Sequence, residues 1–185
     1  MYRLVIQLSE SEGGSKVDLD DFLGNAHQTL ASAKTALTQN GVQSVDLAAK
    51  VFGVGLAVAF DPDSYTVLSV QGPPNDGQLM LTCGVLRDVT QDRLRVLDAC
   101  NRHTQNLPAF AVYLHDAELG WDVLMQQSFP LRLLLDVPPF YLSLIEGMPK
   151  VANQAREAMS QASVGGVPYT WTVDDVDRLF TRSLL

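Results

Sequence analysis

Apolar residues recur at spacings of three and four along three long stretches of this sequence, and such spacing places them on one face of a helix. The pattern predicts helices over residues 18–40, 90–107 and 140–162. Asn40-Gly41 and Pro108 provide the signals that end the first two helices. Each helix therefore has an apolar face that needs another element to cover it.

The second of these helices has a predicted buried stripe that contains Leu94, Leu97, Asn101 and Thr104, and that Val96 and Cys100 widen. A buried side-chain amide requires hydrogen-bond partners. The side chain of Asn101 therefore either ties this helix to a neighbouring backbone or to a second subunit, or it lies at the surface.

Five shorter stretches are rich in branched and aromatic residues and are separated by polar turns, as strands are. They cover residues 51–60, 65–70, 79–86, 109–115 and 121–127. Strands joined by short turns pair antiparallel. The pattern therefore predicts an α+β protein with a single antiparallel sheet of about five strands, in the order α-β-β-β-α-β-β-α.

Both ends of the chain carry additional predicted elements. Residues 4–8 read as a short strand that is followed by a polar link. Near the other end, Thr172 can cap a last helix whose apolar side consists of Val173, Val176, Leu179, Phe180 and Leu184. We therefore divide the chain into an N-terminal strand and link (1–15), an α+β domain (16–162), and a linker with a C-terminal amphipathic helix (163–185).

The composition limits the possible partners. The chain has 185 residues, of which 46% are hydrophobic and 18% charged, and this suits one globular domain with appended ends. Its net charge of −8, without a cluster of basic residues, argues against binding to nucleic acid or to an anionic membrane. We expect a protein partner with a basic or amphipathic segment. The N-terminal apolar run is too short for a signal peptide, so we expect a cytoplasmic protein.

The residues that most often bind metals are scattered. Cys83 and Cys100 lack the spacing of metal ligands and are expected to be buried thiols. His27, His103 and His115 belong to three different predicted elements, with no second histidine at helical spacing. We therefore expect neither a metal site nor a cofactor.

One short stretch has an enzymatic interpretation. An apolar strand that begins at Gly55 ends in Asp61-Pro62-Asp63. This resembles the first motif of haloacid-dehalogenase-like phosphatases, in which one Asp attacks phosphorus and the other acts as acid and base beside a magnesium ion. The same residues, followed by Ser64, also have the composition of a type I turn. A magnesium-dependent phosphatase-like enzyme using Asp61 and Asp63 is thus the alternative function.

The run from Arg95 to Arg102 (Arg-Val-Leu-Asp-Ala-Cys-Asn-Arg), the aromatic hairpin after it, and the long helix that carries Glu157-Ala-Met159 together resemble a known family. This is the type III secretion chaperone-like superfamily, in its YbjN branch, which is widespread in bacteria. The resemblance covers roughly residues 19 to 162. It implies an acidic homodimer that binds extended or amphipathic segments of other proteins, or a regulatory protein, without catalytic residues.

We therefore expect a non-catalytic, chaperone-like or regulatory protein-binding domain that acts as a homodimer. The exposed edge of the sheet needs to be covered by another element. The strand surface at Gly53 and Gly55 lacks side chains and needs covering too; it suits a bulge or the close approach of another backbone. The expected contact elements are the N-terminal strand or the long helix, through Leu142 and Ile145.

The C-terminal helix has two interpretations. Its apolar stripe must dock on this core, on a dimer partner, or in a groove that would otherwise hold a client segment. We therefore expect either an autoinhibitory or dimer-locking tail anchored by Trp171 and Phe180, together with Val176 and Leu179, or a packing helix that completes the core.

Overall fold

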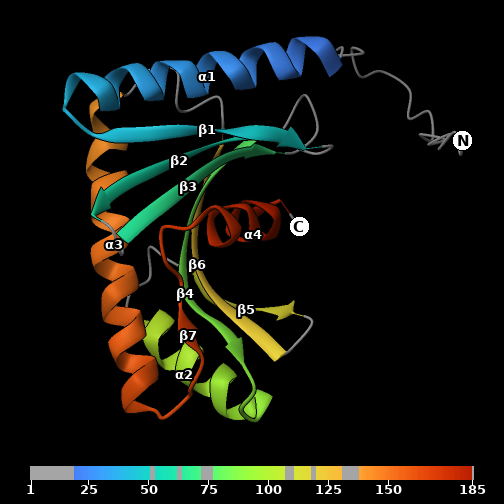
Figure 1. The fold of residues 1–185 in the computed structure, drawn as a ribbon, viewed down its shortest axis with the longest axis vertical. Coiled ribbons are helices and arrows are strands. Elements are labelled where there is room, and N and C mark those ends of the chain that lie inside the picture. Colours follow the sequence, from blue (N-terminus) through green and yellow to red (C-terminus); the bar gives the residue numbers. More distant parts are fainter. Residues whose placement is uncertain are drawn as a thin grey trace, which may run out of the picture.

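The computed structural model describes residues 19–50, 53–61, 64–71, 77–106, 111–117, 120–130 and 138–184, which form four helices and seven strands (Figure 1). The helices are α1 (Leu19–Gln39), α2 (Arg93–Asn106), α3 (Pro138–Gln161) and α4 (Val173–Ser183). The strands are β1 (Gln43–Lys50), β2 (Gly53–Asp61), β3 (Ser64–Gln71), β4 (Gln78–Val89), β5 (Ala111–Ala117), β6 (Gly120–Pro130) and β7 (Val167–Pro168).

The strands form one antiparallel sheet with the order β1-β2-β3-β4-β6-β5, and β7 is added beside β4. One edge of β4 pairs with β6. The other edge pairs with β3 as far as Thr82 and then with β7 at Leu86 and Arg87. The chain that leaves α3 therefore rejoins the sheet through two residues before it forms α4.

The predicted fold class, an α+β protein with a single antiparallel sheet, is confirmed, but the sheet has more strands than the expected five. β1 was not predicted, because polar residues such as Gln43 and Asp46 interrupt its pattern. They are tolerated because β1 is the last strand of the described sheet on that side, where it meets solvent. β7 lies in the segment expected to be a linker. The predicted strand over residues 4–8 lies outside the described residues.

Helices α1, α2 and α3 pack on one face of the sheet and α4 packs on the other, within the concave side of the curved strands (Figure 1). Adjacent residues of a strand point to opposite faces, so Val67 and Leu68 of β3 belong to different cores. The core of the three-helix face includes the fully buried Leu37, Leu68, Leu81, Ile145 and Met148. The core of the α4 face consists of Ala57, Tyr65, Val67, Leu124, Tyr169, Val176, Leu179 and Phe180.

The predicted buried stripe of α2 is confirmed at Val96 and Cys100 and wrong at Leu94 and Asn101. Leu94 is 74% exposed and Asn101 is exposed as well, whereas Val96, Ala99 and Cys100 are buried. The helix turns its smaller side chains toward β5 and α3, since Ala99 and Cys100 allow these elements to approach closely. Asn101 therefore takes the alternative surface position and ties α2 to nothing in the described core.

Other predictions are confirmed. α1 ends just before Gly41, whose φ of +73° is the left-handed stop expected there. Cys83 and Cys100 are buried free thiols. Burial raises the pKa of Cys83 to about 12 and that of Cys100 to about 11. None of the helices in the described part of the chain combines the length and the apolar composition needed to cross a membrane.

Candidate functional site

The boundaries of α4 follow from its own sequence. Thr172 is the N-cap, and its side-chain oxygen accepts a hydrogen bond of 3.2 Å from the backbone N–H of Asp175, as expected from the sequence. Asp174 and Asp175 lie in the first turn and Arg182 in the last, which suits the helix dipole. α4 is thus a well-specified helix whose position depends on what its sides contact.

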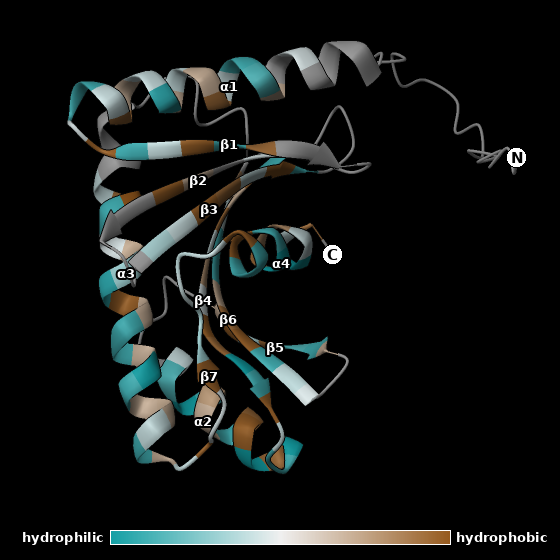
Figure 2. Ribbon diagram, in the orientation of Figure 1, coloured by the Kyte–Doolittle hydropathy of each residue, from teal (hydrophilic) through white to brown (hydrophobic). Residues whose placement is uncertain are grey.

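The apolar side of α4 is buried against the sheet. Leu179 and Phe180 are fully buried and Val176 nearly so. Apolar and polar residues alternate along the helix in Figure 2, as in a helix with one apolar side. Val173 was expected on this side but is 85% exposed, because as the first residue of α4 it lies beyond the patch that the helix covers. The docked face therefore consists of the last two turns.

Two glycines shape the sheet surface under this segment. A Cβ atom added at Gly55 of β2 would lie 2.4 Å from the ring of Phe180, and one added at Gly84 of β4 would lie 2.3 Å from the ring of Tyr169. Real Cβ atoms do not approach rings so closely, so both positions require glycine while the rings are in place. The sheet thus has two recesses, each filled by an aromatic ring from the C-terminal segment.

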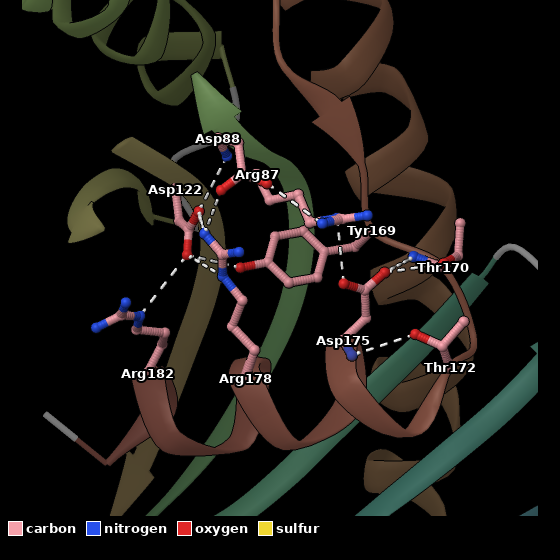
Figure 3. A network of polar contacts seen from close by, with 9 residues as sticks. All are labelled: Arg87, Asp88, Asp122, Tyr169, Thr170, Thr172, Asp175, Arg178 and Arg182. Carbon is pink, nitrogen blue, oxygen red and sulfur yellow. Dashed lines mark hydrogen bonds and ion pairs between the residues drawn. The ribbon is translucent and has the colours of Figure 1, made fainter. Parts of the chain in front are cut away.

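A buried carboxylate lies beside these rings. Asp122 of β6 is 0% exposed, and Oδ2 accepts hydrogen bonds of 2.9 Å from Tyr169 Oη and from Arg178 Nε (Figure 3). Its Oδ1 accepts a bond from Arg178 Nη2 and one of 3.3 Å from the backbone N–H of Asp88. Arg182 Nε lies 3.6 Å from Oδ2. Among the described residues, the three side chains that pair with Asp122 thus belong to the C-terminal segment.

A bulge in β4 adds a second carboxylate. Asp88 has a φ of +55° where the pairing of β4 with β6 shifts register. This left-handed conformation is uncommon for residues other than glycine, although Asp tolerates it better than most. The Asp88 side chain accepts a bond of 2.9 Å from Arg178 Nη2 and one of 3.2 Å from Arg87 Nη1. The bulge therefore directs Asp88 toward α4.

Arg87 extends the network to the start of α4. Its Nε lies 3.1 Å from Oδ1 of Asp175, which is almost fully buried. Oδ2 of Asp175 accepts bonds from the backbone N–H and the hydroxyl of Thr170, at 2.9 and 2.8 Å. Asp175 therefore links α4 both to Arg87 of β4 and to Thr170 in the segment that leads into the helix.

The network is electrically balanced, because three carboxylates (Asp88, Asp122 and Asp175) meet three guanidinium groups (Arg87, Arg178 and Arg182) (Figure 3). Burial raises the pKa of Tyr169 well above its usual range, and the Asp122 carboxylate raises it further. Burial alone would lower the pKa of Arg178, but its hydrogen bonds to Asp122 and Asp88 outweigh that effect and raise it.

Two further contacts complete the docking. The hydroxyls of Ser183, near the end of α4, and of Ser69 in β3 share a hydrogen bond of 3.0 Å. The ring of Trp171 meets that of Tyr65 edge-on, with centroids 5.2 Å apart. These contacts span the segment from its entry to its last turn.

The structure brings together four of the residues predicted as contacts, since Trp171, Val176, Leu179 and Phe180 all belong to the α4 face. Ile145 is separate from them, because it is fully buried in the three-helix core. A side chain buried there is not available to a partner, so the interpretation of Ile145 as a contact residue is wrong for the folded chain. Leu142 lies in α3, but its side chain is outside the described structure.

Sequence reasoning missed the polar half of this site. Asp122 interrupts the apolar residues of its strand, and Arg178 and Arg182 lie four apart on α4. A charged residue within a strand, together with two arginines on one side of an amphipathic helix, was a signal for pairing. What the sequence could not supply was their proximity.

The phosphatase alternative is not supported. β2 ends at Asp61 and β3 begins at Ser64, and these two residues face each other across the hairpin. That arrangement fits the turn interpretation, although Asp63 itself lies outside the described residues. All the paired strands are antiparallel, whereas the phosphatase motif requires parallel strands that alternate with helices.

No protein-family model and no curated protein matches this sequence. Among solved structures, the chain is similar to YbjN of E. coli, to which a role in transcription regulation has been ascribed, with 11% identity, a TM-score of 0.45, and coverage of 71% of this chain and 92% of that one. It is also similar to an uncharacterized protein from Methanothermobacter thermautotrophicus, with 14% identity, a TM-score of 0.47, and coverage of 74% of this chain and 99% of that one. YbjN, whose family the sequence resembles, is thus among the structures to which this fold is similar.

Proposed function

We propose that this chain is a non-catalytic protein-binding domain with a chaperone-like or regulatory role, and that it binds its partner on the α4 face of the sheet. In this proposal α4 is an internal occupant of the binding surface. A helical segment of the partner replaces it.

The observation that carries the proposal is the way α4 is attached. The chain leaves the three-helix core at the buried Val164 and passes through Gly165 and Gly166, both of which have a positive φ. After the short β7, α4 meets the sheet through its side chains. Another helix can supply such side-chain contacts without breaking the hydrogen bonds of the sheet, as in other helix-in-groove complexes.

The energetics of docking allow exchange. Burial of Val176, Leu179 and Phe180 contributes roughly 1.5–3 kcal/mol for each side chain. An isolated helix as short as α4 is marginal in water, so the free energy of ordering it opposes docking. A partner helix that is already folded does not have this cost, and it can compete with α4 for the same surface.

A reversible lock on α4 tests the proposal in the full chain. The hydroxyls of Ser69 and Ser183 are 3.0 Å apart, so the double variant Ser69→Cys/Ser183→Cys brings two thiols within reach of a disulfide. The probe is a labelled peptide with the sequence of residues 167–185, and binding is measured by fluorescence anisotropy. We expect the reduced variant to bind the peptide and the oxidised variant not to bind it.

The single variants Ser69→Cys and Ser183→Cys are the matched controls, since neither can form the lock and both should bind under either condition. Peptide binding by the oxidised double variant would show that the peptide binds at a site other than the α4 face, and this would contradict the proposal. Absence of binding in the reduced form, at peptide concentrations far above that of the protein, would contradict the proposal.

We also propose that the chain acts as a homodimer, which pairs through the edge of β1. Within the described residues β1 pairs only with β2, and its Val45 is 52% exposed. An unpaired edge strand with an exposed apolar residue favours pairing with a second copy. Gly55 no longer supports this proposal, since Phe180 of the same chain covers it. Light scattering should give a dimer mass for the native chain and a monomer mass for Val45→Lys; a native monomer at tens of micromolar would refute the dimer.

A further inference from the structure

We infer that the partner segment bound in place of α4 is an amphipathic helix that carries an arginine and, two residues later, an aromatic residue. Asp122 selects the arginine and the recess at Gly55 selects the aromatic ring. This inference rests on the proposed function, because it names the partner of that same surface.

The arginine follows from the burial of Asp122. The two charged side chains that pair with this carboxylate belong to Arg178 and Arg182, and both leave with α4, whereas Tyr169 precedes the helix. Once α4 has left, water hydrates the carboxylate. Any helix that covers it again must bring donors of its own, because a buried and unpaired carboxylate is strongly unfavourable.

Arginine suits this position better than lysine does. Arg178 uses Nε on one oxygen of Asp122 and Nη2 on the other, and the same Nη2 reaches Asp88. A guanidinium group offers such a planar fork of donors, whereas an ammonium group offers a point charge.

The aromatic residue follows from the shape of the sheet. The recess at Gly55 lies on β2 and is filled by the Phe180 ring, while Asp122 lies on β6, beyond β3 and β4 in the strand order. The helix lies in the concave side of the sheet between them (Figure 1). Residues two apart point about 200° apart around a helix, given 3.6 residues in each turn. An arginine and an aromatic residue at that spacing therefore reach opposite sides of the trough.

The charge of the uncovered face also favours a basic side chain on the helix that covers it. Without α4, the sheet contributes Asp88 and Asp122 to the network and only Arg87 in return. The excess is negative, as is the net charge of the whole chain, which is −8. This negative excess attracts the guanidinium group of the incoming helix.

The test uses the full chain with Leu179→Asp, which weakens docking of its own α4 and leaves Asp122 and Gly55 unchanged. Labelled peptides with the sequence of residues 167–185 are added, and their dissociation constants are measured by fluorescence anisotropy. We expect Arg178→Ala and Phe180→Ala in the peptide to weaken binding by about thirtyfold or more. Arg178→Lys should restore only part of that loss. Val173→Ala is the matched control, since Val173 is exposed, and it should bind as the native peptide does.

A double-mutant cycle identifies the residue that selects the arginine. In a receptor that also carries Asp122→Asn, the difference in affinity between the peptides with Arg178 and with Arg178→Ala should become much smaller, with only the contact to Asp88 remaining. If Leu179→Asp prevents folding, a chain with only Ser69→Cys is used instead, and peptides that carry Ser183→Cys are trapped on it as disulfides. The yield of trapped peptide then replaces the dissociation constant.

The outcomes separate the two proposals. If no peptide binds or is trapped, the α4 face does not accept a helix, and the proposed function fails. If the native, Arg178→Ala and Phe180→Ala peptides all bind alike, the face binds helices without this selectivity, and only the inference about the partner is overturned.

Discussion

The two faces of the sheet hold their helices by different means. The three-helix face is packed mainly with aliphatic side chains such as Leu68, Leu81 and Ile145. The α4 face combines aromatic rings with two glycine recesses. It also holds Asp122 and Asp175, which are the two charged side chains that are buried in the described structure. Aliphatic packing contributes much stability and little directional preference, whereas hydrogen-bonded charges require defined partners.

This difference suggests two roles for the two faces. Elements on the aliphatic face are fixed, because separating them exposes apolar surface and uncovers no fully buried charge among the described residues. Arg156 of α3, which donates a hydrogen bond of 3.2 Å to the backbone oxygen of Val85, is only partly buried. Undocking of α4 also exposes apolar surface, but it returns Asp122 and Asp175 to water, which offsets part of the cost. The α4 face is therefore the one suited to exchange, and a network with defined partners makes that exchange selective.

A matched pair of leucine substitutions would test this comparison most strongly. Leu68 and Leu179 are both fully buried, the first on the three-helix face and the second on the α4 face. Leu68→Ala should lower the free energy of global unfolding by about 2–5 kcal/mol, measured by urea denaturation. Leu179→Ala should lower it by less, because the loss cannot exceed the free energy of docking α4. Equal losses, with α4 and the core unfolding together, would show that α4 belongs to one cooperative core.

Removal of the central guanidinium should loosen α4 selectively. Arg178→Ala leaves Asp122 without its main partner, which typically costs about 3–5 kcal/mol when the charge remains buried. α4 can undock and hydrate the charge, so we expect a loss of up to about 3 kcal/mol that is confined to α4. Hydrogen exchange of the α4 amides measures it, with Trp171 fluorescence in a Trp121→Phe background as a second readout.

The exposed pair of Arg102 and Asp98 on α2 provides the control for that experiment. Arg102→Ala should change stability by no more than about 1 kcal/mol, because solvent screens exposed ion pairs. Faster exchange in α1 as well as α4 after Arg178→Ala would mean that the two faces are not independent.

The sequence predicted the helices, the hairpin and, apart from Val173, the apolar side of α4, because these depend on spacing and caps within short segments. It also indicated that the strand surface at Gly55 was bare. It could not identify the occupant of that surface, since the ring of Phe180 comes from a distant part of the chain, and the expected occupant was a backbone. Asp122 was missed for the same reason: its partners on α4 are remote in sequence, and no local pattern reports them. Leu94 and Asn101 of α2 were misjudged, because β5 and α3 pack against Val96, Ala99 and Cys100 and leave those two residues at the surface.

Two glycine substitutions should have effects of opposite sign. Gly55→Ala places a Cβ atom 2.4 Å from the Phe180 ring, so the ring must move, and we expect docking of α4 to weaken by about 1–3 kcal/mol. Gly24 of α1 has nothing within 4 Å of its added Cβ atom, so Gly24→Ala should stabilise the chain by about 0.5–1 kcal/mol through helix propensity. Thermal denaturation and exchange of α4 amides measure both. A neutral Gly55→Ala would show that the recess does not hold Phe180 in solution.

Alkaline pH should release α4 gradually. Burial and the neighbouring Asp122 raise the pKa of Tyr169 in the docked state, whereas the undocked hydroxyl has a pKa of about 10. Below pH 10 both states keep the proton and docking is unaffected. Above it the undocked state loses its proton first, so docking should weaken by about 1 kcal/mol at pH 11. Trp171 fluorescence in the Trp121→Phe background follows the undocking.

Tyr65 lies on the same face of the sheet, and burial raises its pKa as well. The control is therefore a comparison of the native chain with Tyr169→Phe. Tyr169→Phe should retain docking to a higher pH than the native chain; identical profiles would assign the transition to Tyr65 or to the thiols of the three-helix face.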